Sequence, residues 1–403
     1  MSSFSYSEFD LFQPTEEHSL LRKTVRDFSE AEIEPQAAKY DREEQFNGEL
    51  FRKLGGLGLL GITVPEEFGG AGMDPLAVVI AHEEISTSDP GFCLAYLAHA
   101  LLCVNNLCVN GSESQKREFL PKLCSGEHIG AMGMSEPDAG TDVLGMKTRA
   151  REEDDGFVVN GRKMWITNGC VDDGNTPCDC LLFYARTDKE SDEKAQLSSF
   201  LVSKGTPGFS VGQKIRDKLG MRASNTAEMC FDDCRIPLEN LVGKPGESLL
   251  HMMRNLEIER VGLAAMSLGI ARRSLSVMMK YAEERKAFGR KLKEFGQIQE
   301  HIATSFAEYK AARTYVYDTA RRMKLDREGT RLDSDGVKLF ATPIGKKIAD
   351  RAIQVLGGYG YVGEYVVERL WRDSKLLEIG GGTLEAHQKN ITKDLYRDGA
   401  ALR

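Results

Sequence analysis

The run Gly133-Met-Ser-Glu-Pro-Asp-Ala-Gly-Thr-Asp142, followed after a predicted β-hairpin by Trp165-Ile-Thr-Asn-Gly169, is the most informative part of this sequence. The first run combines the hydroxyls of Ser135 and Thr141 with a Pro-Asp-Ala-Gly turn, so its loop can offer N–H groups and short donors to a planar polar ligand. Strand alternation would put the Trp165 ring and the Thr167 hydroxyl on one face. A flat heteroaromatic ligand such as a flavin suits this pair, and an ordinary hairpin with an exposed loop is the alternative.

The residues around these runs have the period-two pattern of a β-domain. Phe157-Val-Val, Asn160-Gly161 and Lys163-Met-Trp-Ile predict a hairpin, because Asn-Gly adopts the positive φ angles of a type I′ turn. Further strands are predicted at 181–185, 198–202, 209–211 and 227–231. We therefore expect a middle β-domain, a barrel or a sandwich, over residues 126–240.

Helical patterns precede the β-domain. Residues 1–125 predict an N-terminal α-helical domain, with a helix from Glu17 to Tyr40 that Pro35 ends or kinks. Residues 54–72 are too rich in glycine for a regular helix and indicate a loop region. Residues 91–108 are apolar on all sides, which predicts a buried helix.

Helical patterns also follow the β-domain and continue to the C-terminus. Residues 241–403 predict a C-terminal four-helix bundle. Its helices are expected near 246–284, 296–324, 335–356 and 383–397. The predicted fold class is therefore α+β and multidomain, in the order helical, β, helical.

Composition limits the possible classes of protein. The 403 residues are 41% hydrophobic and 28% charged, which is typical of a globular protein with two or three domains. A net charge of −8 without a basic stripe argues against a nucleic-acid partner. We expect no membrane span, and the acidic N-terminus, which lacks a signal or transit pattern, predicts a cytoplasmic location. The nine cysteines lack CxxC spacing, which indicates reduced thiols and no metal site.

Glu259 lies on an apolar helical stripe, where a carboxylate is unexpected. Steps of three and four residues from Leu256 to Leu263 pass through it. Desolvation would raise the pKa of an unpaired carboxyl there, and a carboxylate with a raised pKa suits a general base for a carbon acid. Arg260 is adjacent but points about 100° away on a helix. A buried ion pair with a distant arginine is the alternative.

The runs Met134-Ser-Glu-Pro-Asp-Ala-Gly-Thr-Asp142 and Trp165-Ile-Thr-Asn-Gly169 together resemble the flavin signature of the acyl-CoA dehydrogenases. The likeness extends from Pro65-Glu-Glu-Phe-Gly-Gly70 to the glycine-rich segment before Thr383. It implies the same helical–β–helical layout, non-covalent FAD, an acyl-CoA substrate and an electron-transfer flavoprotein as acceptor. It also implies a homo-oligomer, expected to be a tetramer.

The resemblance extends to the position of the base. Most of the family carries a glutamate in a pattern like Tyr-Glu-Gly-Thr before the last helix, but Glu378-Ile-Gly-Gly-Gly-Thr383 puts Gly381 at that position. Isovaleryl-CoA dehydrogenases and a few relatives carry the base on a bundle helix in a run like Leu-Glu-Arg, and this chain has Ile258-Glu259-Arg260 there. The resemblance therefore assigns the catalytic base to Glu259 and sets aside Glu257 and Glu378.

The resemblance also implies ligand contacts. Arg285, in Arg285-Lys-Ala-Phe-Gly-Arg290, is similar to an arginine that reaches the FAD pyrophosphate of a neighbouring subunit, although a basic surface segment would also explain it. The family's glutamine eleven residues later is replaced by Gly296, which leaves Gln297 as the candidate. The expected cofactor-binding residues are Met132, Met134, Ser135, Thr141, Trp165, Thr167, Arg285, Gln297, Gln354, Gly357, Gly358, Thr383 and Glu385. The expected substrate-binding residues are Thr141, Ile258, Arg260, Gly381 and Gly382, with the Gly381 amide on the thioester oxygen.

The expected function is FAD-dependent α,β-dehydrogenation of a short branched acyl-CoA such as isovaleryl-CoA, because three glycines at 380–382 leave space near the β- and γ-carbons. A cyclic or substituted succinyl group is the alternative. A glutaryl group is disfavoured because Cys93 stands where glutaryl-CoA dehydrogenases carry an arginine. An oxidase is disfavoured because the chain is shorter than typical acyl-CoA oxidases. A non-catalytic acyl-CoA-binding scaffold is disfavoured because Glu259 and the Trp165 and Thr167 pair are retained.

Overall fold

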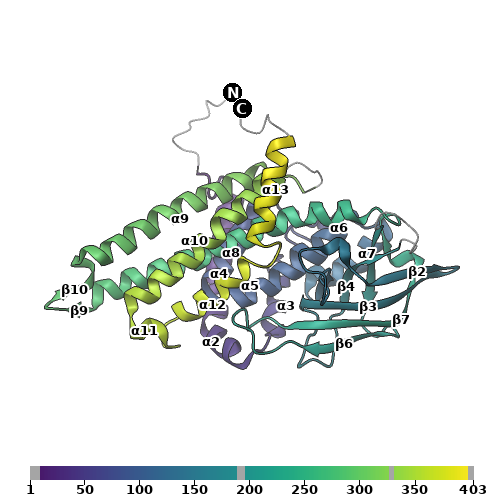
Figure 1. The fold of residues 1–403 in the computed structure, drawn as a ribbon, viewed down its shortest axis with the longest axis horizontal. Helices are drawn as coiled ribbons and strands as arrows, with labels where there is room; N and C mark the ends of the chain where they lie inside the picture. Colours follow the sequence, from purple (N-terminus) through teal and green to yellow (C-terminus); the bar gives the residue numbers. More distant parts are fainter. Residues whose placement is uncertain (1–9, 188–195, 326–330, 398–403) are drawn as a thin grey trace.

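The computed structural model describes residues 10–187, 196–325 and 331–397, and these form a helical part, a β-sheet and a second helical part in that order. Figure 1 shows the sheet at the right and the long helices of the C-terminal part at the left, with N-terminal helices between them. The predicted fold class is therefore confirmed.

The N-terminal domain is built from short helices whose first turns are capped by side chains. Thr15, Asp74 and Asp89 each accept a hydrogen bond from a backbone N–H in the first turn of the helix that follows. Ser112 and Gln115 form a reciprocal capping box. The helices are α1 (Glu16–Phe28), α2 (Glu34–Glu43), α3 (Gly48–Gly56), α4 (Pro75–Ser88), α5 (Pro90–Leu97), α6 (Asn106–Asn110) and α7 (Glu113–Ser125), with a short 3-10 helix at Glu66–Phe68.

The predicted helix from Glu17 to Tyr40 is interrupted as expected, although proline is only part of the cause. A π-helical segment, Ser29–Ile33, separates α1 from α2. Pro35 lies in the first turn of α2, where a missing N–H costs no helical hydrogen bond.

The stretch Pro90–Asn110 is long and apolar enough to cross a membrane by length and composition alone, with a mean hydropathy of 1.8 over its most apolar window. No membrane span was expected from the sequence, yet this stretch meets the length and composition of one. Within the protein 83% of that window is buried, as in a core helix. Its middle, Ala98–Asn105, is π-helical.

The middle domain contains an eight-stranded sheet in the order β6-β7-β3-β2-β4-β5-β8, with β1 paired to β4 in parallel. Four of the predicted strands are confirmed as β4, β5, β6 and β7. The strands are β1 (Gly130–Gly133), β2 (Arg149–Glu153), β3 (Gly156–Thr167), β4 (Cys180–Arg186), β5 (Leu197–Ser203), β6 (Phe209–Lys214), β7 (Thr226–Pro237) and β8 (Leu241–Val242), with 3-10 helices at Val143–Gly145 and Leu238–Asn240.

The predicted hairpin at Asn160-Gly161 is wrong, because β3 runs through both residues. The turn lies earlier, at Asp154 and Asp155, since Glu153 pairs with Gly156. At Gly161 the pairing of β3 with β7 is irregular, and a Cβ there would lie 2.5 Å from Thr148 Oγ1. The glycine therefore permits a bulge and a close approach of β2 rather than a turn.

The C-terminal domain is an antiparallel helical bundle dominated by α8, which is 37 residues long. A two-stranded hairpin follows it and projects at the far end from the sheet (Figure 1). The sequence did not predict α11 or α12. The elements are α8 (Ser248–Glu284), β9 (Lys286–Ala287), β10 (Arg290–Lys291), a 3-10 helix (Leu292–Glu294), α9 (Gly296–Arg322), α10 (Arg331–Leu356), α11 (Gly358–Tyr361), α12 (Val367–Leu377) and α13 (Leu384–Arg397).

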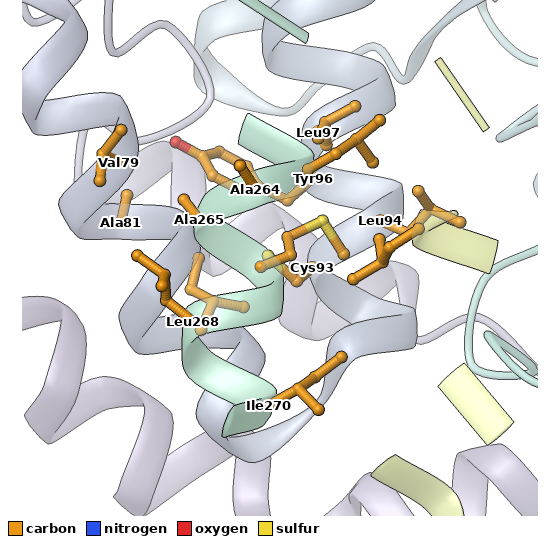
Figure 2. Packing of buried hydrophobic residues seen from close by; sticks show 14 of the residues in the cluster. Val79, Ala81, Cys93, Leu94, Tyr96, Leu97, Ala264, Ala265, Leu268 and Ile270 are labelled. Atoms are coloured by element: carbon orange, nitrogen blue, oxygen red, sulfur yellow. The ribbon is translucent and has the colours of Figure 1, made fainter. Parts of the chain in front are cut away.

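One apolar core joins the two helical domains. Figure 2 shows α8 lying between α4 and α5, with Ala264 and Ala265 of α8 close to Tyr96 and Leu97 of α5. Small side chains on α8 allow this close packing, since a Cβ on Gly262 would lie 2.9 Å from Leu101 Cδ1. The first half of α8 is therefore held rigidly against the N-terminal domain.

Candidate active site

A cavity of about 520 Å³ lies where α5, α8 and the turn before α13 meet the end of β1 and the bulged part of β3. Ten of the residues singled out in the sequence line it: Met132, Met134, Ser135, Thr141, Trp165, Thr167, Glu259, Gly381, Gly382 and Thr383. Residues far apart in the chain thus form one site. A volume of this size is in the usual range for a cofactor or substrate pocket.

The β-domain wall of the cavity is fixed by Glu136, which the sequence did not identify as important. Its carboxylate accepts hydrogen bonds from the backbone N–H groups of Lys147, at 2.5 Å, and Thr148, at 3.0 Å. Lys163 is fully buried and donates to Glu136 at 2.8 Å and to the Met134 carbonyl at 3.2 Å. Burial lowers the pKa of Lys163 to about 8, and Glu136 opposes that shift. This buried pair holds the Met134–Thr141 loop against β3.

The backbone at Trp165 differs from the regular strand that was predicted. Its φ is +62°, and the pairing of β3 with β7 shifts between Lys163 and Ile166, so simple alternation does not apply. Both Trp165 and Thr167 nevertheless line the cavity. The Trp165 side chain is 55% exposed, which leaves a large indole surface at the cavity wall.

Glu259 lies on α8 with 7% of its surface exposed. Burial raises the pKa of its carboxyl to about 7, and the charges of Arg260 and Lys338 oppose the rise. Among the described residues no donor hydrogen-bonds to its buried Oε2 atom. The alternative, an ion pair of Glu259 with a distant arginine, is absent in the described part of the chain, whereas Arg260 places a guanidinium nitrogen 3.0 Å from Asp335.

The turn Gly380–Gly382 faces Glu259. Gly381 and Gly382 have φ angles of +65° and +98°, which side chains other than glycine rarely adopt. A Cβ on Gly381 would lie 2.6 Å from Leu263 Cδ1 and 3.3 Å from Glu259 Cδ. A larger residue at 381 would therefore occupy the space beside the Glu259 carboxylate.

The two other glutamates considered as bases lie in different surroundings. Glu378 forms ion pairs at 2.7 Å with Lys346 and Lys375. Although burial raises its pKa, these two lysines outweigh that effect and lower it. Glu257 lines a separate cavity of about 10 Å³ together with Ile258.

Several predicted ligand contacts lie outside the cavity. These are Ile258, Arg260, Arg285, Gln297, Gln354, Gly357, Gly358 and Glu385. Arg285 is exposed at the end of α8, with its guanidinium 6.0 Å from the centre of the Tyr359 ring. Glu385 lies in the first turn of α13, two residues from the cavity-lining Thr383. These residues keep their predicted roles as untested predictions.

Sequence analysis missed the apolar wall that faces Glu259. Leu94, Leu97, Ala98 and Leu102 come from α5 and the π-helical segment that follows it. Their only signal was their place in an apolar run, which does not distinguish a pocket wall from a core.

The residues present suit a planar cofactor next to a reacting carbon chain. A half-exposed indole can cover one face of a flat ring, and the hydroxyls of Ser135, Thr141, Thr167 and Thr383 can bond its polar edges. Among the described residues that line the cavity there is no arginine, lysine or histidine. The Glu259 carboxyl thus faces an apolar space and can exchange a proton near neutral pH.

Comparison with known proteins was made against family models and individual proteins. Three models match in order: acyl-CoA dehydrogenase N-terminal domain over residues 15–127, middle domain over 131–234 and C-terminal domain over 249–396. Isovaleryl-CoA dehydrogenase, mitochondrial, of Oryza sativa subsp. japonica is 42% identical, covering 96% of this chain and 93% of the relative. The short-chain specific acyl-CoA dehydrogenase of Clostridium acetobutylicum is 39% identical, over 96% and 100%. The structure of butyryl-CoA dehydrogenase from Megasphaera elsdenii superposes with a TM-score of 0.90 at 33% identity, covering 98% of this chain and 100% of that one.

Proposed function

The chain belongs to the acyl-CoA dehydrogenase family, and on this premise we propose that it dehydrogenates a short branched-chain, isovaleryl-like acyl-CoA to the 2-enoyl-CoA. FAD would be its cofactor and an electron-transfer flavoprotein its electron acceptor. The observation that carries this proposal is Glu259, a buried carboxylate with one oxygen free of described partners, at the wall of an apolar cavity.

Glu259 removes the proton from the α-carbon of the thioester. A base works best when its pKa lies near the pH of the reaction, and burial brings the pKa of Glu259 to about 7. The proton transfers to a carboxylate that shares the cavity wall with Leu97, Leu263 and Gly381, so the reacting carbon lies against apolar groups.

Negative charge develops on the thioester oxygen as the proton leaves, and a positioned N–H donor stabilises it. We assign this role to the Gly381 amide, as the family resemblance implies. The left-handed conformation of Gly381 and Gly382 forms a narrow turn without side chains, so a ligand can approach the backbone closely.

The cofactor would be held by the indole and hydroxyl groups of the cavity. Trp165, Thr167, Ser135 and Thr141 belong to the same chain as Glu259. Arg285, Gln297, Gln354, Gly357 and Gly358 lie outside this cavity, and we assign them to the FAD of a second copy in a homo-oligomer. When bound, FAD supplies an acceptor for the hydride that leaves the β-carbon, and the electrons then pass to the flavoprotein partner.

The acyl group is inferred from the residues around Glu259. Leu94, Leu97, Ala98, Leu102, Leu263, Leu376 and Ile379 provide the apolar lining. No cation of the described residues lines the cavity, which argues against a distal carboxylate such as that of a glutaryl or succinyl group. Cys93 is fully buried and lies outside this lining. A compact cyclic acyl group remains the second candidate, because it too is uncharged.

The test is to measure bound flavin and then its bleaching by a panel of acyl-CoAs without oxygen. We expect a yellow protein that releases about one FAD per chain on denaturation. Isovaleryl-CoA should bleach it faster than butyryl-CoA, a cyclic acyl-CoA or glutaryl-CoA. Release of no FAD would refute the cofactor assignment. Binding of acyl-CoA without bleaching would favour a non-catalytic scaffold, and fastest bleaching by glutaryl-CoA would refute the acyl assignment.

A further inference from the structure

A cluster of buried charged side chains contacts the turn Gly380–Gly382 without lining the substrate cavity. Asp335 and Lys338 come from α10, His387 from α13 and Arg260 from α8. The first three are 0% exposed and Arg260 is 7% exposed. The reaction scheme above assigns no part to Asp335, Lys338 or His387.

Lys338 is in contact with the turn itself. Its Nζ donates a hydrogen bond to the Gly382 carbonyl and lies 3.1 Å from Nε2 of His387. On the other side of the ring, His387 Nδ1 lies 2.7 Å from an Asp335 carboxylate oxygen. The same Asp335 oxygen lies 3.0 Å from Arg260.

The protonation of His387 depends on its pKa as well as its contacts, because Nε2 lies 3.1 Å from Lys338 Nζ and 3.0 Å from the Gly382 carbonyl oxygen. Nδ1 faces a carboxylate and therefore carries a proton, so Nε2 of the neutral ring accepts a hydrogen bond from Lys338. Burial and the charges of Lys338 and Arg260 lower the pKa of His387, while Asp335 opposes them, which favours the neutral ring. The chain of donors thus runs from Lys338 to His387 to Asp335.

The turn needs such an anchor because its own backbone is permissive. Glycine has more conformational freedom than any other residue, and three of them occur in succession here. The His387 ring packs directly on Gly382, where an added Cβ would lie 3.1 Å from Cε1 of the ring. Lys338 and His387 therefore meet at the same atom of the turn, because Lys338 donates to the Gly382 carbonyl oxygen and His387 Nε2 lies 3.0 Å from that oxygen.

We propose that Lys338 is a positioning residue for proton removal by Glu259: His387 and Asp335 orient its ammonium group, which fixes the Gly382 carbonyl and supplies a counter-charge to the Glu259 carboxylate. This inference rests on the proposed function. Within the described residues Lys338 forms neither a hydrogen bond nor an ion pair with Glu259, so Lys338 favours the ionised base by charge and leaves the Glu259 Oε2 atom available for the substrate proton.

The charged and titratable groups around Glu259 come from α8, α10, α12, α13 and β4. Arg260 follows it on α8 and Lys338 of α10 acts on it by charge, while Asp335 of α10 contacts Arg260 and His387 of α13 contacts Lys338. The charge of Glu259 raises the pKa of Tyr184 on β4. The charge of Glu378, at the end of α12, raises the pKa of Lys338. Burial lowers the pKa of Lys338 to about 7 and Glu259 opposes this shift, so the two groups stabilise each other's charged forms.

Two variants and one matched control test the proposal in the FAD-loaded protein. Lys338→Met removes the charge and the hydrogen bond at similar length. His387→Leu removes the partner that orients Lys338, and its rescue variant, His387→Gln, keeps an acceptor for Lys338 and a donor for Asp335. Lys347→Met is the control, because Lys347 is an exposed lysine on the same helix.

The first measurement needs no turnover. The infrared carbonyl band of protonated Glu259, assigned as the band that Glu259→Gln lacks, should disappear as the pH rises through about 7 in the wild type. In Lys338→Met this transition should move up by about one pH unit. His387→Leu should shift it less, in the same direction, while His387→Gln and Lys347→Met should leave it unchanged.

The second measurement is the pH profile of flavin bleaching by acyl-CoA. Lys338→Met should be about fivefold slower at pH 7 and should recover as the pH rises, because its base ionises later. An unmoved infrared transition, or a loss of rate that is the same at every pH, would overturn the proposal and leave Lys338 a structural residue. If no acyl-CoA bleaches the wild type but the infrared transition still moves in Lys338→Met, the proposed function fails and the charge coupling stands. If Lys338→Met does not fold, an unmoved transition in His387→Leu overturns the proposal.

Discussion

Two buried carboxylates in this chain, Glu84 on α4 and Glu259 on α8, differ in their partners. They are 1% and 7% exposed, so both have lost most of their water. Glu84 forms ion pairs with Arg26 at 3.1 Å and Arg272 at 2.6 Å, and it is also paired with Arg22. Burial raises its pKa, but these arginines outweigh burial and bring it to about 2. Burial raises the pKa of Glu259 to about 7 with only partial opposition from Arg260 and Lys338.

The difference shows that burial alone does not determine what a carboxylate does. The neighbour of Glu84 in sequence, Glu83, adds bonds to Tyr309 and Tyr317 of α9 and an ion pair to Arg313. The pair of glutamates therefore connects α1, α4, α8 and α9 as a scaffold. Glu259 has a proton affinity suited to chemistry because its surroundings do not neutralise it.

The largest effect is expected from Glu259→Gln, which keeps the shape of the side chain and removes the base. The rate of flavin bleaching by acyl-CoA should fall by about 10²–10⁴. FAD and acyl-CoA should still bind, since the amide leaves the rest of the cavity unchanged. Stopped-flow absorbance gives the rate, and a rate near that of the wild type would remove Glu259 from the mechanism.

The same variant should gain stability, with a defined pH dependence. Since the pKa of Glu259 is raised from 4.5 to about 7, the folded protein holds this proton more tightly than the unfolded chain, and stability is lost as the pH rises through that window. At about 1.4 kcal/mol per unit the loss reaches about 3 kcal/mol above pH 7. Glu259→Gln should therefore have a higher Tm than the wild type at pH 8 and an equal Tm near pH 4.5.

Glu84→Gln is the matched change at the scaffold site, and it should have the opposite sign. Removing one member of a buried ion-pair network destabilises a protein by about 3–5 kcal/mol. The pKa of Glu84 is lowered, so its contribution is present above pH 4.5 and is lost as the pH falls towards 2. Tm measured from pH 8 downward should show a deficit that narrows below pH 4.5. An equal Tm at pH 8 would show that the network is not stabilising.

Gly381→Glu should lower turnover rather than raise it. A side chain at this position must adopt a φ of +65°, and its Cβ would approach Leu263 Cδ1 to 2.6 Å. The strain alone costs about 1–3 kcal/mol of folding stability, and a turn displaced from the reacting atoms should lower the rate by roughly tenfold or more. The second carboxylate would also repel Glu259. Steady-state turnover with isovaleryl-CoA decides this, and an increase would point to position 381 as a competent place for the base.

Arg285→Ala should have the smallest effect. This exposed residue lies far from the cavity, so its loss should leave Tm and the bleaching rate of FAD-loaded protein nearly unchanged. Loss of one charge-assisted hydrogen bond, worth about 1.5–3 kcal/mol, should weaken FAD retention by about tenfold or more. FAD release on dilution measures this, and Arg290→Ala on the same hairpin is the control. Unchanged retention, or a wild type that is a monomer with tightly bound FAD, would contradict the assignment.

The sequence predicted the cavity residues whose chemistry is visible in a short motif. Each of these residues differs from the hydrophobic pattern around it, and this difference identified it as a candidate. They are the loop from Met134 to Thr141, Trp165, Glu259 and the glycines at 380–382. The order of helical and β-parts followed from periodicity, which depends only on neighbouring residues.

The features that were missed depend on residues distant in sequence. Lys163 reaches Glu136 across 27 positions, and Lys338 reaches His387 across 49, which no local pattern reveals. Asn160-Gly161 was assigned to a turn because its dihedral preferences also suit a bulge, and only the pairing with β2 and β7 distinguishes the two. Leu94 and Leu97 have the composition of a core, so their exposure to a cavity was not predictable.

The length of α8 has a consequence for mixtures of defective subunits. Along its axis Glu259 and the last residue, Glu284, are about 38 Å apart, and Arg285 follows directly, so one chain cannot bring Glu259 and Arg285 to the same flavin. If Arg285 serves a second copy, Glu259→Gln and Arg285→Ala should complement each other. When one subunit carries Glu259→Gln and its partner carries Arg285→Ala, one active site has both substitutions and the other has neither. At limiting FAD, co-expressing the two impaired variants should therefore restore activity that neither has alone.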